Sequence, residues 1–191
     1  MKTLKTIAIV FSLATIFTSC SNDSDATPVN EEELITTITA VFTPEGGGTA
    51  ITLESKDLDG EGPDAPAITI SAPFAQNTTY NGVVTFENES VNPAEDITEE
   101  ILAEAEDHQI FYQKTGTLNG FSYSTNADNF DANGKPVGLQ TVFTTTTAAT
   151  GTLKIILIHL PNKSAAGVSD GDITNAGGGT DAEAIFNITV N

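Results

Sequence analysis

The chain has little of what usually cross-links a protein or clamps an anionic ligand. Its 191 residues include one cysteine, one methionine and no tryptophan, and all seven basic residues are lysines. A single cysteine excludes an internal disulfide, so stability must come from packing, hydrogen bonds and any bound ions. The lack of arginine excludes the bidentate guanidinium clamps that commonly hold phosphate and carboxylate substrates.

Positive charge of any kind is scarce. The 26 acidic residues outnumber the seven lysines, and the net charge is −19. A surface of this sign repels nucleic acid and anionic lipid headgroups. It favours cations, either metal ions or a basic partner surface. The alternative is that the acidity only keeps the protein soluble.

The single cysteine, Cys20, follows a short apolar run. Lys2 and Lys5 precede this run, which covers residues 7–17 and is followed by two small residues. A bilayer span needs about 20 apolar residues, so the run is too short to cross a membrane. The pattern predicts an export signal over residues 1–19. Cys20 at the cut site resembles the lipobox of bacterial lipoproteins, which implies that its sulfur and new N-terminus carry acyl chains such as palmitate.

An acidic tether is expected to follow the lipidated cysteine, so that the two together cover residues 20–32. This stretch contains Val29 as its one large apolar residue and is otherwise polar, a composition typical of a flexible linker. Residues 21–25 resemble the acidic stretch that directs some Bacteroidota lipoproteins to the cell surface. The predicted location is therefore the outer membrane, with the protein on its periplasmic side or at the cell surface.

Residues 33–191 are expected to form one β-rich domain. Apolar and polar residues alternate in many short runs that are rich in β-branched side chains and separated by Gly-rich turns. The pattern predicts an antiparallel β-sandwich or small barrel of about nine strands. In residues 153–160 both faces are apolar, so this strand should be central and covered on both sides.

One amphipathic helix is expected to interrupt the strands. Asn92 can cap it, Pro93 suits its first position, and it should end near Asp107. The apolar residues Ile97, Ile101, Leu102 and Ala105 would form its buried stripe.

A loop with alternating carboxylates is a candidate calcium site. Asp57, Asp59 and Glu61 alternate before a glycine, and Asp64 could add a further oxygen. Calcium takes six to eight oxygen ligands, and this spacing resembles the first half of a calcium loop. The alternative is that aspartate and glycine simply form the turn.

The two histidines, His108 and His159, are candidate ligands of a transition metal. Two imidazoles with a carboxylate can bind zinc or a similar ion. The sequence does not bring them together in space, and the simpler interpretation is one buried and one surface histidine. A G-x-S-x-G pattern at 167–171 lies in a predicted loop with no histidine after it, so a serine hydrolase is excluded.

Several segments together resemble a group of uncharacterised Bacteroidota outer-membrane lipoproteins. They are residues 85–90, 93–100, 108–112, 133–138, 159–163 and 171–177. Some members of that group are associated with TonB-dependent receptors, and some carry the label of a type 1 periplasmic binding fold, which denotes a two-domain α/β structure. The resemblance implies an outer-membrane location and partnership with a receptor, and it supplies no catalytic residues.

These observations predict a non-catalytic, membrane-anchored lipoprotein. Its expected role is that of a binding or accessory protein for an outer-membrane receptor or for the uptake of a metal or nutrient. The alternative is a structural or adhesive cell-surface module that is stabilised by calcium.

Overall fold

The computed structural model describes residues 34–60 and 62–191, which lie in one compact unit, Glu32–Asn191. The predictions for the export signal, for lipidation at Cys20 and for the tether fall outside these ranges, as does Glu61.

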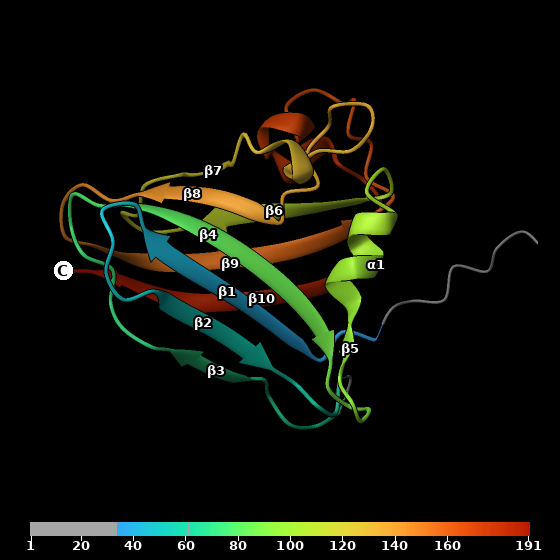
Figure 1. Ribbon diagram of the computed structural model, residues 1–191, viewed down its shortest axis with the longest axis horizontal. Coiled ribbons are helices and arrows are strands. Elements are labelled where there is room, and N and C mark those ends of the chain that lie inside the picture. The colour runs from blue at the N-terminus through green and yellow to red at the C-terminus, as the bar shows by residue number, and fades with distance from the viewer. Residues whose placement is uncertain (1–33, 61) are drawn as a thin grey trace, which may run out of the picture. The chain divides into compact units, whose positions relative to one another are not determined.

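In the described part of the chain, ten strands form two antiparallel sheets that face each other (Figure 1). The larger sheet contains β1 (Thr37–Pro44), β2 (Ile51–Lys56), β3 (Ala67–Ile70), β4 (Thr79–Asn88), β5 (Glu95–Asp96), β7 (Phe121–Tyr123) and β8 (Gln140–Thr144). The smaller sheet contains β6 (His108–Lys114), β9 (Ala149–His159) and β10 (Gly179–Val190). The larger sheet has the order β3-β2-β1-β4-β8-β7, with β5 beside β4, and the smaller has the order β10-β9-β6. The prediction of a mostly β fold is confirmed, and because the sheets do not close on themselves the fold is a sandwich.

The main core lies between the sheets. It is rich in phenylalanine, and Phe74 meets the rings of Phe42, Tyr80 and Phe143 edge-on, with ring centroids 5.0–5.3 Å apart. Edge-to-face contacts of this kind add to the stabilisation that apolar burial gives. Among the residues that the structure describes, the buried core residues all lie within residues 38–190, so a chain that begins at Ser21 keeps every one of them.

Strand β9 is central, as its sequence predicts. Leu153, Ile155 and Leu157 face the main core, whereas Ile156 and Ile158 face a second cluster on the other side of the sheet. Residues of the long connection between β9 and β10 cover that second cluster, and this connection contains the short 3-10 helices η2 (Val168–Asp170) and η3 (Ile173–Asn175). The strand is therefore apolar on both faces because a loop, and not a second layer of strands, covers its outer face.

The α-helix α1 (Ile97–Ala103) is shorter than predicted. Residues 95–96 pair with β4 as β5, and the Asp96 carboxylate accepts the Thr98 N–H at 2.9 Å, so Asp96 caps the helix and the predicted cap at Asn92 is wrong. Ile97 and Ile101, four positions apart, are buried. Leu102 is 44% exposed, because the next position along a helix is rotated by about 100° away from the buried side.

A buried ion pair joins two long loops. The Lys163 ammonium donates to Asp131 Oδ2 at 3.1 Å and to the Ala105 carbonyl, and the two charged side chains are 6% and 2% exposed. Asp131 lies in the connection between β7 and β8, which also contains the 3-10 helix η1 (Ala127–Asn129), and Lys163 lies in the connection between β9 and β10. The pair therefore holds both loops against the segment that follows α1.

Candidate metal centre

Three strands of the smaller sheet bring the two histidines and one carboxylate to the same end of the sandwich. His108 is the first residue of β6 and His159 the last residue of β9, and the two lie opposite each other in the antiparallel ladder. Their side chains share the inner face of the sheet with Leu157, which pairs with Ile110 two residues further along. The sequence did not predict this meeting because only the register of β6 against β9 produces it.

A bulge in β10 adds the carboxylate. Thr180 pairs with Ile158 and Ala182 pairs with Leu157, so the register shifts by one residue and Asp181 is left between them without a residue opposite. A bulge re-aims the side chain at the point where it occurs. Here the Asp181 carboxylate turns toward both imidazoles.

The three side chains form a compact group of metal-binding atoms. One donor atom from each of His108, His159 and Asp181 lies within 4.8 Å of the other two. Asp181 Oδ2 is 3.6 Å from His108 Nε2, and Asp181 Oδ1 is 4.0 Å from His159 Nδ1. The imidazole rings are stacked with centroids 4.8 Å apart and planes 12° apart.

The C-terminus of α1 orients His108. Its Nδ1 lies 3.2 Å from the carbonyl oxygen of Glu104, the C-cap residue of the helix. A carbonyl oxygen only accepts, so this contact favours the tautomer with its hydrogen on Nδ1, in which Nε2, 3.6 Å from Asp181 Oδ2, is the nitrogen for a metal ion. This is the arrangement in which a metal-binding histidine is usually held, with one ring nitrogen on a carbonyl and the other on the metal.

Burial favours the neutral form of His108. Its side chain is 2% exposed, whereas those of His159 and Asp181 are 14% and 10% exposed. Burial is the main cause that lowers the pKa of His108 below 6.5, and the neighbouring His159 lowers it further, whereas the Glu104 carbonyl and the Asp181 carboxylate oppose the shift. A neutral imidazole is the form that binds a metal ion.

Folding stability should decrease as the pH falls below 6.5, in part because of His108. Since the pKa of His108 is lower in the folded protein than its ordinary value of 6.5, acid protonates the unfolded chain first and shifts the equilibrium toward it. The contribution of His108 to folding stability is thus fully present above pH 6.5. It is lost as the pH falls from 6.5 to the lower pKa that His108 has in the folded protein. Urea denaturation of the metal-free wild type and of His108→Gln should give a shallower pH dependence for the variant. If the free energy of unfolding changed equally with pH in both proteins, burial would not lower the pKa of His108.

The chemistry of the group suits a transition metal ion. Two imidazoles with one carboxylate bind zinc and similar first-row ions, whereas calcium and magnesium prefer oxygen ligands alone. Bonds of about 2.0–2.1 Å in a tetrahedral site place ligand atoms about 3.3 Å apart. The three side chains would therefore move together by about an ångström on metal binding, and they would leave a further coordination position open.

The calcium candidates do not form such a group among the residues that the structure describes. Asp59 Oδ2 accepts the N–H of Asp64 at 3.3 Å, which closes the loop on its own backbone. Asp57 lines a cavity between the sheets. Because Glu61 lies outside the described ranges, calcium binding by Asp57, Asp59, Glu61 and Asp64 stays a prediction.

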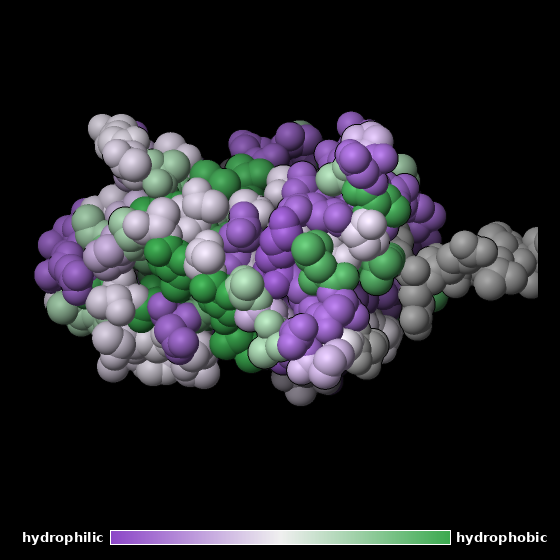
Figure 2. Space-filling view, turned by 90° about the horizontal axis from the view of Figure 1, so that it is seen from below, coloured by the Kyte–Doolittle hydropathy of each residue, from purple (hydrophilic) through white to green (hydrophobic). Residues whose placement is uncertain are grey.

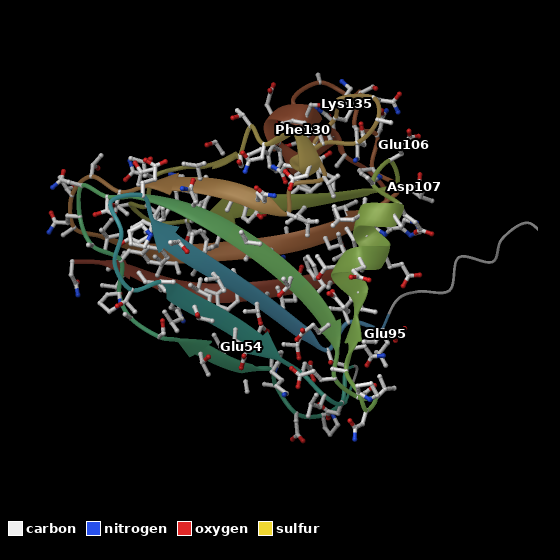
Figure 3. All side chains as sticks on the ribbon, viewed as in Figure 1. Glu54, Glu95, Glu106, Asp107, Phe130 and Lys135 are labelled. Carbon is white, nitrogen blue, oxygen red and sulfur yellow. The ribbon has the colours of Figure 1, made fainter. Side chains whose placement is uncertain are left out.

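The metal-binding group lies at a strongly acidic end of the sandwich. We call "acidic end" the four connections 57–66, 89–107, 124–139 and 160–178, which lie at the end of the sandwich where β6 begins and β9 ends (Figure 1). In the described part of the chain these connections contain fifteen Asp and Glu against two lysines, whereas the connections at the opposite end contain Glu45 alone. Figure 3 shows Glu95 before α1, and Glu106 and Asp107 after it. Such a distribution raises the local concentration of cations.

Comparison with known proteins does not assign the chain to a family. No protein-family model matches the chain, and searches of curated proteins and of solved structures gave no match. The resemblance to Bacteroidota lipoproteins therefore stays an expectation from the sequence. Among residues 34–60 and 62–191, no helix has the length and apolar character needed to cross a membrane.

Proposed function

We propose that this protein is a non-catalytic, lipid-anchored binding protein of the bacterial outer membrane that captures a divalent transition metal ion. The ion would bind to His108, His159 and Asp181 and would pass to an outer-membrane receptor, with a TonB-dependent receptor as the expected partner. The convergence of these three side chains from three different strands is the observation that carries the proposal.

Two further features support capture and release. The acidic end attracts cations, and the neutral, oriented His108 imidazole is ready to bind one. His159 is the more exposed of the two histidines, so it offers the side from which an ion can arrive and leave. Three protein ligands would hold the ion while leaving a position for the incoming group of a receiving protein.

Metal binding can be tested on the chain Ser21–Asn191, which keeps every core residue that the structure describes. Purified without chelators, it should contain or take up one equivalent of zinc, and cobalt(II) should give the visible absorption bands of a tetrahedral site. His159→Gln should lower the metal affinity by more than about 100-fold, because loss of an outer-shell partner alone costs about 10–100-fold.

The control is Asp170→Asn, which removes an exposed carboxylate at the same end without touching the metal-binding group. It should bind zinc like the wild type. Stoichiometric calcium without zinc would contradict the proposal and would favour the structural module stabilised by calcium. A chain that binds no metal ion would contradict both.

A further inference from the structure

A cavity of about 640 Å³ opens between the two sheets beside the metal-binding group. Its described walls come from the chain just before β1 and its first residues, from the loop between β2 and β3, and from the first residues of β10, including Asp181. A volume of this size is typical of sites for small organic ligands. Figure 2 shows the molecule from below the view of Figure 1, where hydrophobic surface borders hydrophilic surface that lies toward the α1 end.

The walls combine apolar side chains with negative charge. Leu34, Ile35 and Pro66 supply apolar surface, while the charged residues in the wall are Asp57, Asp181 and Glu183. Glu183 is already paired with Lys154, with 2.6 Å between the charged atoms. In the described part of the chain no lysine or histidine lines the cavity. An occupant that complements these walls is a small molecule with a positive charge.

Asp57 provides the place for that charge. Its N–H donates to the Thr36 carbonyl at 2.7 Å, which fixes the backbone, while its Oδ1 is buried and has no hydrogen-bond donor among the described residues. A buried carboxylate oxygen without a donor is costly. Because the Asp57 side chain lines the cavity, an ammonium group bound there would lie beside this carboxylate and would balance its charge.

Asp181 links the cavity to the metal ion, because the same side chain belongs to both. Three protein ligands leave a coordination position open, and Asp181 is the member of the group that lines the cavity. We propose that the cavity binds a small organic amine whose nitrogen donor completes the coordination of the metal ion and whose ammonium group meets Asp57. This inference rests on the proposed function, and it makes the cargo a metal ion together with a nitrogenous chelator.

Histamine and 4-methylimidazole test this arrangement. Both offer an imidazole to the metal, and only histamine carries an ammonium group. Isothermal titration of the zinc-loaded chain Ser21–Asn191 at mildly alkaline pH should show histamine binding at least about tenfold more tightly, the gain expected of one charge-assisted hydrogen bond. Asp57→Asn should abolish this preference without changing the zinc affinity. Asp64→Asn, which changes an exposed carboxylate in the same loop, should keep it.

The outcomes separate the two proposals. No zinc uptake would overturn the proposed function and this inference with it. Normal zinc uptake with equal affinity for the two imidazoles, or a preference that survives in Asp57→Asn, would overturn this inference alone. Removal of zinc from the protein by histamine, detected as free zinc–histamine complex after filtration, would also overturn it.

Discussion

Lys163→Met should lower the free energy of unfolding by about 3–5 kcal/mol, the usual cost of removing one partner of a buried ion pair. The variant would leave Asp131 as a buried charge, since its side chain is only 2% exposed. Burial lowers the pKa of Lys163, while its hydrogen bond to Asp131 opposes this shift. The ammonium is thus held in the interior by its partner. Urea denaturation with the linear extrapolation would measure the loss.

The matched control is the double variant Lys163→Met with Asp131→Asn. Asparagine keeps an oxygen for the N–H groups of Asn133 and Lys135, which Asp131 Oδ1 accepts at 2.9 and 2.8 Å, and it removes the unpaired charge. Most of the lost stability should therefore return in the double variant. If the single and double variants were equally unstable, the loss would come from the packing of the lysine stem and not from the unpaired, buried charge of Asp131.

Zinc should raise the thermal stability of the chain by a comparable amount. A ligand that binds only the folded state at 1,000 times its dissociation constant stabilises that state by about 4 kcal/mol. For a chain of this size each kcal/mol of added stability raises the midpoint temperature of thermal unfolding by about 2–4 °C. Zinc should therefore raise this temperature by about 8–16 °C. Differential scanning fluorimetry with a dye, with and without zinc, would record it.

Asp181→Asn should abolish most of that shift. The amide keeps the size of the side chain and removes the charge that faces both imidazoles. Asp170→Asn, with the same change of charge at the same end, should behave like the wild type. A zinc shift of the same size in all three chains would mean that the ion binds to the acidic end at large and not to His108, His159 and Asp181.

The strands could be predicted from the sequence because buried and exposed side chains alternate along a strand. In β9 the apolar residues on both faces predicted a central, doubly covered strand, and both clusters exist. The bounds of α1 were harder to predict from the sequence. Pro93 is compatible with a helix start, but residues 95–96 pair with β4 instead, and such pairing depends on where β4 passes in space. The helix propensity of these residues does not reveal whether a strand lies beside them.

The candidate site was half predictable. His108 and His159 stood out because the chain has only two histidines, and their types indicated a transition metal. Asp181 did not stand out, because it is one of 26 acidic residues and its role depends on a shift of register in β10. Asp57 was selected as a calcium ligand from its alternation with Asp59, whereas in the structure it faces a cavity.

The bulge at Asp181 also makes the site depend on the length of the strand. If one residue were lost between Gly179 and Ala182, all three ligand types could still be present while β10 ran against β9 in a continuous ladder. The carboxylate would then point according to the ordinary alternation of a strand, and the metal-binding group would lose one of its three members. In related chains, therefore, an insertion or deletion at this point should abolish metal binding as effectively as the replacement of a histidine.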